Sequence, residues 1–181
     1  WQTTMENTQE TNFLPVQIAV MTVSDTRTLA VDRSGDTLVE RLTKAGHVLS
    51  DRAIIKDEVD LIADKLREWI DNPEIDAVIT TGGTGVTGRD VTPEALARVW
   101  EKDIPGFGEL FRWISYQKIK TSTVQSRACA GVANGTYLFA LPGSTGACRD
   151  GWDEILKDQL DIRHKPCNFV ELMPRLNEHR A

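Results

Sequence analysis

The chain has few cysteines, few histidines and no long apolar run, and each shortage argues against a class of protein. Its 181 residues include three cysteines, Cys129, Cys148 and Cys167, which lie far apart and form no Cys-x-x-Cys pair. Such a sparse, odd set predicts a reduced, cytoplasmic protein without a disulfide framework. The three histidines have no metal-ligand spacing, which disfavours a zinc site. No run of about 18 apolar residues occurs, so we expect no membrane span.

Positive charge is also scarce. The chain has 21 Lys and Arg against 27 Asp and Glu, a formal net charge of −6, which argues against nucleic acid as a partner. A nucleotide remains compatible, because backbone amides and a divalent cation neutralise phosphates locally. No internal repeat or linker divides the chain, so we expect a disordered tail at 1–12, one domain at 13–172 and a C-terminal tail at 173–181.

The spacing of apolar residues predicts alternating strands and helices. Strands are expected at 16–23, 48–55 and 75–81, and helices after a Ser34 cap, at 59–70 and after a Thr92 cap. This alternation is typical of a parallel sheet with helices on both faces. Asn134-Gly135 between two apolar runs predicts a hairpin, and a last helix is expected at 147–160. The expected fold is a three-layer α/β/α domain with a mostly parallel sheet and one antiparallel strand.

A loop rich in glycine and threonine, from Thr80 to Gly88, is the strongest functional signal. Glycine permits positive φ and lets backbone N–H groups approach an anion. Gly83–Gly88 satisfies Gly-x-Gly-x-x-Gly, but the dinucleotide fingerprint follows the first strand and runs directly into a helix. This loop follows the third strand, and no Gly-Lys-Ser/Thr closes it as in a P-loop. The pattern favours another kind of phosphate loop over a merely flexible turn.

Other polar residues follow the remaining predicted strands. Ser24 follows the first strand, Asp57 the second, and Gly143 and Ser144 the hairpin. In open parallel sheets, ligands bind beyond the carboxyl ends of the strands. We therefore expect these residues and the loop to meet at one edge of the sheet.

Two acids, Asp57 and Asp90, are the main candidates for metal binding. In one interpretation, each is a solvated charge in a loop or at the end of a helix. In the other, the two acids together hold Mg²⁺ with substrate phosphates. Asp25 and Glu58 are weaker candidates of the same kind.

A hydroxyl-rich segment containing Ser122 and Ser126 is interpretable either as a turn or as a binding patch. Arg127 next to it pairs either with a phosphate or with a surface acid. Farther upstream, Phe107, Phe111 and Trp113 predict a partly exposed apolar patch, which would indicate self-association.

Three segments carry a family resemblance: TTGGTGVTGRDVTPEAL at 80–96, STVQSRACAGVANGTYLFALPGST at 122–145, and RHKPCNF at 163–169. Together they resemble the MoaB/MogA family of molybdenum cofactor biosynthesis proteins, over nearly all of 15–170. The segments PGFGELFR and KPCNF look more like the MoaB branch. The family's fold is a three-layer α/β domain, in agreement with the expected order of elements.

The resemblance implies a nucleotidyltransferase that uses Mg²⁺, with ATP and molybdopterin as substrates. AMP passes from ATP to the terminal phosphate of molybdopterin, and pyrophosphate is released. The resemblance places the catalytic, metal-holding acids on Asp57 and Asp90. It places phosphate contacts on the loop and the lining of the pterin side on four residues beyond it: Thr81, Gly82, Gly83, Thr84 and Gly85, then Ser122, Ser126, Gly143 and Ser144. Ser24 is a further binding candidate.

Two alternatives to the enzyme remain open. One is a non-catalytic member of the family that binds molybdopterin or assists assembly. The other is a scaffold domain, because the fold also serves in receptor-clustering proteins, although a short chain without a partner-binding extension disfavours it. Family members assemble as homotrimers or homohexamers, so the resemblance also implies a homo-oligomer.

Overall fold

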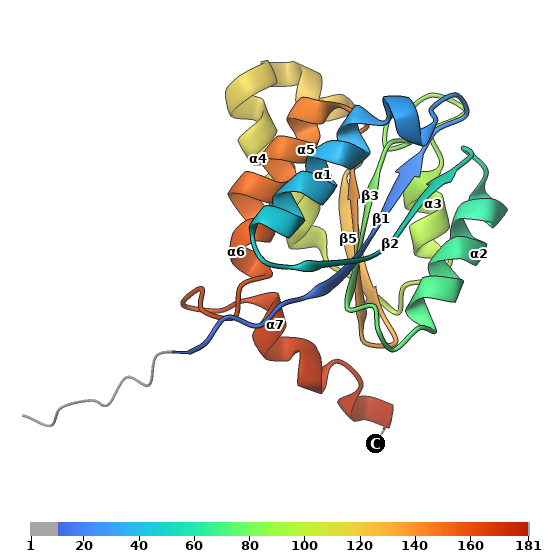
Figure 1. Ribbon diagram of the computed structural model, residues 1–181. Coiled ribbons are helices and arrows are strands. Elements are labelled where there is room, and N and C mark those ends of the chain that lie inside the picture. The colour runs from blue at the N-terminus through green and yellow to red at the C-terminus, as the bar shows by residue number, and fades with distance from the viewer. Residues whose placement is uncertain (1–10, 181) are drawn as a thin grey trace, which may run out of the picture.

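A six-stranded sheet forms the centre of the computed structural model, which describes residues 11–180 (Figure 1). Most of the tail expected at 1–12 therefore lies outside the described residues. In spatial order the strands are β2 (Val48–Ile55), β1 (Gln17–Val23), β3 (Ala77–Thr81), β6 (Thr136–Leu141), β5 (Cys129–Ala133) and β4 (Lys102–Asp103).

The strand pairings confirm the expected mixture of directions. β1 pairs in parallel with β2 and β3, and β3 pairs in parallel with β6. Both pairings of β5, with β6 and with β4, are antiparallel. Asn134 and Gly135 connect β5 to β6 with φ of 46° and 80°. Two consecutive positive φ values are what a tight hairpin turn needs, so the Asn-Gly signal is confirmed.

Helices cover both faces of the sheet (Figure 1). One face carries α1 (Arg33–Lys44), α4 (Pro105–Ile119), α5 (Thr145–Gly151) and α6 (Lys157–Gln159), and the other carries α2 (Val59–Ile70) and α3 (Thr92–Ala97). The short turns η1 (Leu29–Val31) and η2 (Lys120–Gln125) flank α1 and α4, and the chain ends in α7 (Phe169–Leu172), η4 (Met173–Arg175) and η5 (Glu178–Arg180). No helix in the described part of the chain is long and apolar enough to cross a membrane.

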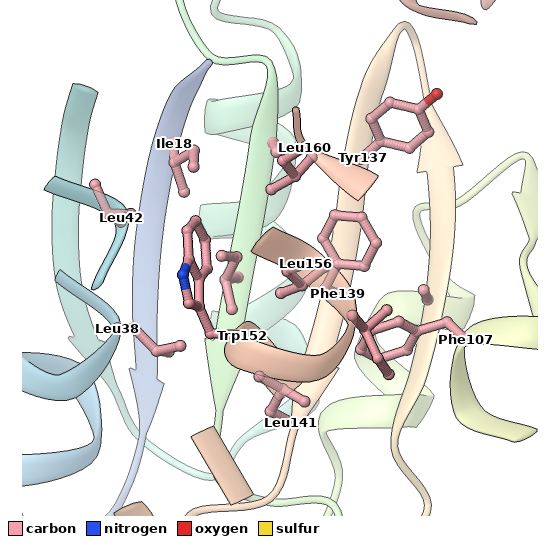
Figure 2. Packing of buried hydrophobic residues seen from close by; sticks show 14 of the residues in the cluster. Ile18, Leu38, Leu42, Phe107, Tyr137, Phe139, Leu141, Trp152, Leu156 and Leu160 are labelled. Atoms are coloured by element: carbon pink, nitrogen blue, oxygen red, sulfur yellow. The ribbon is translucent and has the colours of Figure 1, made fainter. Parts of the chain in front are cut away.

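The single helix expected at 147–160 is wrong in detail. The helical segment begins at Thr145, and a π-helical stretch, η3 (Trp152–Leu156), lies between α5 and α6. A π stretch changes the angle between successive side chains. Here Trp152, Ile155 and Leu156 are all buried. Figure 2 shows Trp152, Leu156 and Leu160 packed over the sheet residues Ile18 and Phe139.

The C-terminal segment packs on the same core. Tyr137 on β6 donates a 2.8 Å hydrogen bond to the carbonyl of Phe169, and both rings lie 4.7 Å apart. Met173 and Leu176, within the region expected to be a tail, also pack against this core. Residues 173–180 therefore cover part of the domain rather than extend from it.

The expected Ser34 cap is also wrong, because Asp32 caps α1 instead. Asp32 accepts a 3.1 Å hydrogen bond from the Gly35 backbone N–H. Its carboxylate also accepts bonds from Thr22 Oγ1 at 2.7 Å and Arg52 Nη2 at 2.9 Å, and the residue is fully buried. Burial alone would raise the pKa of Asp32, but these hydrogen bonds lower it below its usual value. This charged cap anchors the start of α1 to β1 and β2.

Candidate functional site

A cleft of about 710 Å³ opens at the carboxyl edge of the parallel strands. The chain segments after β1, β2, β3 and β6 form one side, and α4 with η2 forms the other. Ligand sites in open α/β sheets occur at this edge. The cleft brings together all but one of the predicted site residues: Ser24, Asp57, Gly82, Gly83, Thr84, Gly85, Asp90, Ser122, Ser126, Gly143 and Ser144.

The glycine and threonine loop meets the cleft with its backbone. Gly82 and Gly83 have φ of 101° and 69°, values that L side chains rarely adopt. A Cβ on Gly82 would lie 2.3 Å from the carbonyl oxygen of Val23, so only glycine fits there. Within residues 11–180, the N–H groups of Gly83 and Thr84 donate no hydrogen bond to the protein. Both residues line the cleft, and backbone amides without a protein partner there are suited to bind an anion.

Thr92 and Thr81 fix this loop from behind. Thr92 Oγ1 donates to the carbonyl of Gly82 at 2.8 Å, and the Thr92 N–H donates to the carbonyl of Gly83 at 3.0 Å. Thr92 was expected to cap α3, but it is the first residue of that helix, because its hydroxyl is used to hold the loop. Thr81 is fully buried and donates to the carbonyl of Pro142 at 3.0 Å. It is the one predicted site residue that does not line the cleft, and it joins the loop to the β6–α5 turn.

Arg127 holds the other end of the loop. Its Nε donates to the carbonyl of Gly85 at 2.7 Å, and its Nη2 donates to the carbonyl of Asp90 at 2.8 Å. The guanidinium also forms an ion pair with Glu94 through both carboxylate oxygens. Of the two interpretations of Arg127, the structure favours pairing with a surface acid.

Asp57 lies at the middle of the loop, with its Oδ1 3.2 Å from the position of a Cβ built on Gly83. No side chain of the described residues hydrogen-bonds this carboxylate. Burial raises the pKa of Asp57, and the charges of Asp25 and Asp90 act in the same direction; the Asp25 backbone and Arg89 oppose them only in part. A carboxylate in such surroundings gains from a nearby cation.

Asp90 borders the same loop at Gly85, two residues after the glycine that Asp57 approaches. Its Oδ2 lies 2.6 Å from a Cβ built on Gly85, and it accepts bonds from the N–H and Oγ1 of Thr87 at 2.9 and 2.7 Å. Burial alone would raise the pKa of Asp90, but these hydrogen bonds lower it below its usual value. Oδ2 therefore closes the loop, and the bonds from Thr87 do not use Oδ1.

Asp25, a weaker metal candidate, is already paired. It forms a two-bond ion pair with Arg89, at 3.0 Å to Nε and 2.9 Å to Nη2. The hydrogen bond from Arg89 lowers the pKa of Asp25. This exposed pair ties the segment after β1 to the loop after β3. Glu58, the other weaker candidate, is exposed at the start of α2 and does not line the cleft.

Several cleft serines use their oxygens to form turns. Ser24 Oγ accepts the N–H groups of Thr26 and Arg27, Ser144 Oγ caps α5 through Ala147, and Ser126 Oγ accepts the N–H of Ala128. Each hydroxyl hydrogen remains able to donate to a ligand. The hydroxyl-rich segment is thus both a turn and part of the cleft wall.

Sequence reasoning missed the contribution of α4 and the role of Arg27. Phe111, Ser115 and Ile119 reach the cleft from α4, and Gln125 from η2. No local pattern marks them, because their position depends on how α4 packs on the sheet. Arg27 follows Ser24 by three residues, so its place after a strand was a usable signal.

These features define an α/β protein with a cleft at the carboxyl edge of its sheet, walled by a glycine loop and two acids. Residues 19–162 match a family described as a probable molybdopterin binding domain, and the chain belongs to this family.

Named relatives agree with the family. Molybdenum cofactor biosynthesis protein B of Escherichia coli K12 is 47% identical over 159 residues, which cover 88% of this chain and 94% of that protein. A crystal structure of a molybdenum cofactor biosynthesis protein B superposes with a TM-score of 0.82 at 37% identity, covering 93% of this chain and 98% of the other. The tungsten cofactor synthesizing protein MoaB from Pyrococcus furiosus superposes with a TM-score of 0.71 at 35% identity, covering 80% and 92%.

Proposed function

We propose that the protein acts in molybdenum cofactor biosynthesis as a Mg²⁺-dependent molybdopterin adenylyltransferase. It would transfer AMP from ATP to the terminal phosphate of molybdopterin and release pyrophosphate. Family membership and the names of the relatives support the pathway. The observation that carries the activity is a loop bordered by two acids, in which two amides have no partner among the described residues.

The donor set fits Mg²⁺. The described residues hold no group of three His, Cys, Asp or Glu that would form an all-protein metal site. Mg²⁺ does not need one, because it binds through one or two carboxylates, water and substrate phosphates. The raised pKa of Asp57 and the Asp90 oxygen that Thr87 does not use match that requirement. Asp57 and Asp90 would hold the ion, which when bound neutralises triphosphate charge.

The protein's own part in the reaction is to hold the reactants in position. The N–H groups of Gly83 and Thr84 would bind phosphate oxygens, and the cleft hydroxyls would orient the acceptor. A phosphate oxygen of molybdopterin attacks the α-phosphorus of ATP, and the bond from that phosphorus to the oxygen bridging to the β-phosphate breaks. One phosphoanhydride bond forms as another breaks, and pyrophosphate leaves with the electron pair.

Acid-to-amide variants test this proposal. We expect Asp57→Asn and Asp90→Asn to lower the rate of adenylylated molybdopterin formation by roughly 10²-fold or more, because each weakens charge neutralisation at the triphosphate. Asp71→Asn is the matched control, since Asp71 is exposed at the far end of α2. Its rate should equal that of the native protein. Full turnover by Asp57→Asn would overturn the assignment.

One observation favours the non-catalytic alternative. Asp90 Oδ2 is committed to Thr87, as expected of an acid that serves only to close a loop. On that account the protein binds molybdopterin but forms no adenylylated product with ATP and Mg²⁺. Binding and turnover measured on the same preparation separate the two functions.

We also propose that the protein self-associates through α4. Leu110, Trp113 and Tyr116 are 42%, 65% and 46% exposed and recur every three residues, so they form one apolar stripe. Of the predicted patch only Trp113 belongs to it, because Phe107 and Phe111 point into the core. A homotrimer or homohexamer would cover this stripe.

A further inference from the structure

Arg27 is the only lysine or arginine that lines the cleft within residues 11–180. Its side chain is 36% exposed. Nη1 donates to Ser34 Oγ at 2.5 Å, and Nη2 donates to the carbonyl of Gly143 at 2.9 Å. These two bonds use only part of the hydrogen-bonding capacity of a guanidinium, which has N–H groups left for an anion.

The guanidinium is held in place before any ligand arrives. Gly143 approaches Gly82 so closely that a Cβ on Gly143 would lie 3.2 Å from the Gly82 Cα. Asp32, fully buried, lies with its Oδ1 3.9 Å from Arg27 Nη1. Because that carboxylate is already hydrogen-bonded by Thr22 and Arg52, it does not saturate Arg27. A fixed guanidinium binds a phosphate with little loss of side-chain entropy.

The charges of the cleft are separated along the loop. Arg27 binds the carbonyl of Gly143, and Gly143 lies beside Gly82. Asp57 lies beside Gly83, and Asp90 lies beside Gly85. The positive end attracts a free phosphate dianion, whereas the negative end repels one unless a cation accompanies it. A phosphorylated molecule without a metal would therefore bind at the positive end, and one that carries a metal would bind at the negative end.

We propose that Arg27 forms a metal-independent binding site for a phosphate monoester at the Gly82 end of the cleft. This inference rests on the proposed function for its occupant, the phosphate of the acceptor. The nucleotide, which carries Mg²⁺, lies at the Asp57 and Asp90 end. Arg27 contributes binding and orientation, and it places the acceptor oxygen on the side of the loop opposite the acids.

The test is titration calorimetry in EDTA with phenyl phosphate, a simple phosphate monoester, as the probe. We expect Arg27→Gln to weaken its binding roughly tenfold, the loss that one charge-assisted hydrogen bond predicts. Arg27→Lys should recover part of the affinity. Arg67→Gln is the control for net charge, because Arg67 lies on α2 and its side chain pairs, among residues 11–180, only with Asp64. It should bind within about twofold of the native protein.

A parallel titration with ATP and Mg²⁺ distinguishes the two sources of phosphate. The affinity for ATP with Mg²⁺ should be nearly the same in Arg27→Gln as in the native protein. Equal losses for both ligands, equal effects of Arg27→Gln and Arg67→Gln, or no metal-free binding by the native protein would each overturn the inference. If Arg27→Gln has a lowered melting temperature, Arg27→Lys replaces it in the test, provided that it melts at the native temperature. A phenyl phosphate affinity of Arg27→Lys equal to that of the native protein would contradict the proposal. Intact Arg27-dependent binding without adenylyl transfer would refute only the proposed function.

Discussion

Replacing Gly83 with alanine tests the geometry of the loop at a position with positive φ and close side-chain neighbours. Gly83 has φ of 69°, and a Cβ there would lie 2.4 Å from Thr92 Oγ1 and 3.2 Å from Asp57 Oδ1. The left-handed backbone costs an alanine about 1–2 kcal/mol. Displacement of Thr92 also breaks its hydrogen bond to Gly82, worth about 1 kcal/mol. We expect a total loss of about 2–3 kcal/mol in the free energy of unfolding.

Gly88 supplies the matched control within the same loop. A Cβ on Gly88 meets no atom within 4 Å, and its φ is not in the positive region. Gly88→Ala should therefore be neutral or stabilise by up to about 1 kcal/mol, through the unfolded chain. Urea unfolding of both variants measures the difference, and titration with ATP and Mg²⁺ should show weaker binding only in Gly83→Ala. Equal stabilities of the two variants would refute the reasoning.

Three further variants test other parts of the structure. Asp32→Ala should destabilise by about 3 kcal/mol in urea unfolding, because it removes a helix cap and the buried partner of Arg52, and Asp32→Asn should recover the cap's share of about 1 kcal/mol. Burial lowers the pKa of His47, so the unfolded chain binds a proton there at higher pH than the folded protein does. The free energy of unfolding should therefore keep its full value above a pH of about 6.5 and decrease below it. His47→Gln should flatten this pH dependence. Trp113→Glu should reduce the proposed self-association, measured by light scattering, whereas Leu61→Glu, at an exposed apolar position on α2, should not.

Local signals were enough to predict most of the sheet, all but the edge strand β4, and much of the cleft. Apolar runs located the strands, and Asn134-Gly135 located the hairpin, because a turn with positive φ depends on its own two residues. The convergence of Ser24, Asp57 and the glycine loop followed from parallel topology alone. Each of these inferences needed only neighbours in sequence or a rule of sheet geometry.

The features that escaped prediction depend on distant contacts. The cap of α1 lies at Asp32 and not Ser34 because Thr22 and Arg52, from two strands, stabilise the buried carboxylate. Thr81 looked like a ligand contact, but its hydroxyl reaches the carbonyl of Pro142, which is 61 residues away. The π stretch at Trp152 likewise reflects packing against the sheet. Tertiary partners decided each of these.

The most direct test of the proposed activity follows a label. The native protein is incubated with molybdopterin, Mg²⁺ and ATP labelled at the α-phosphorus, and the label and the released pyrophosphate are both measured. We expect the label to enter molybdopterin, one pyrophosphate to appear for each label transferred, and EDTA to stop both. Molybdopterin that binds in the cleft but stays unlabelled, with no pyrophosphate released, would contradict it.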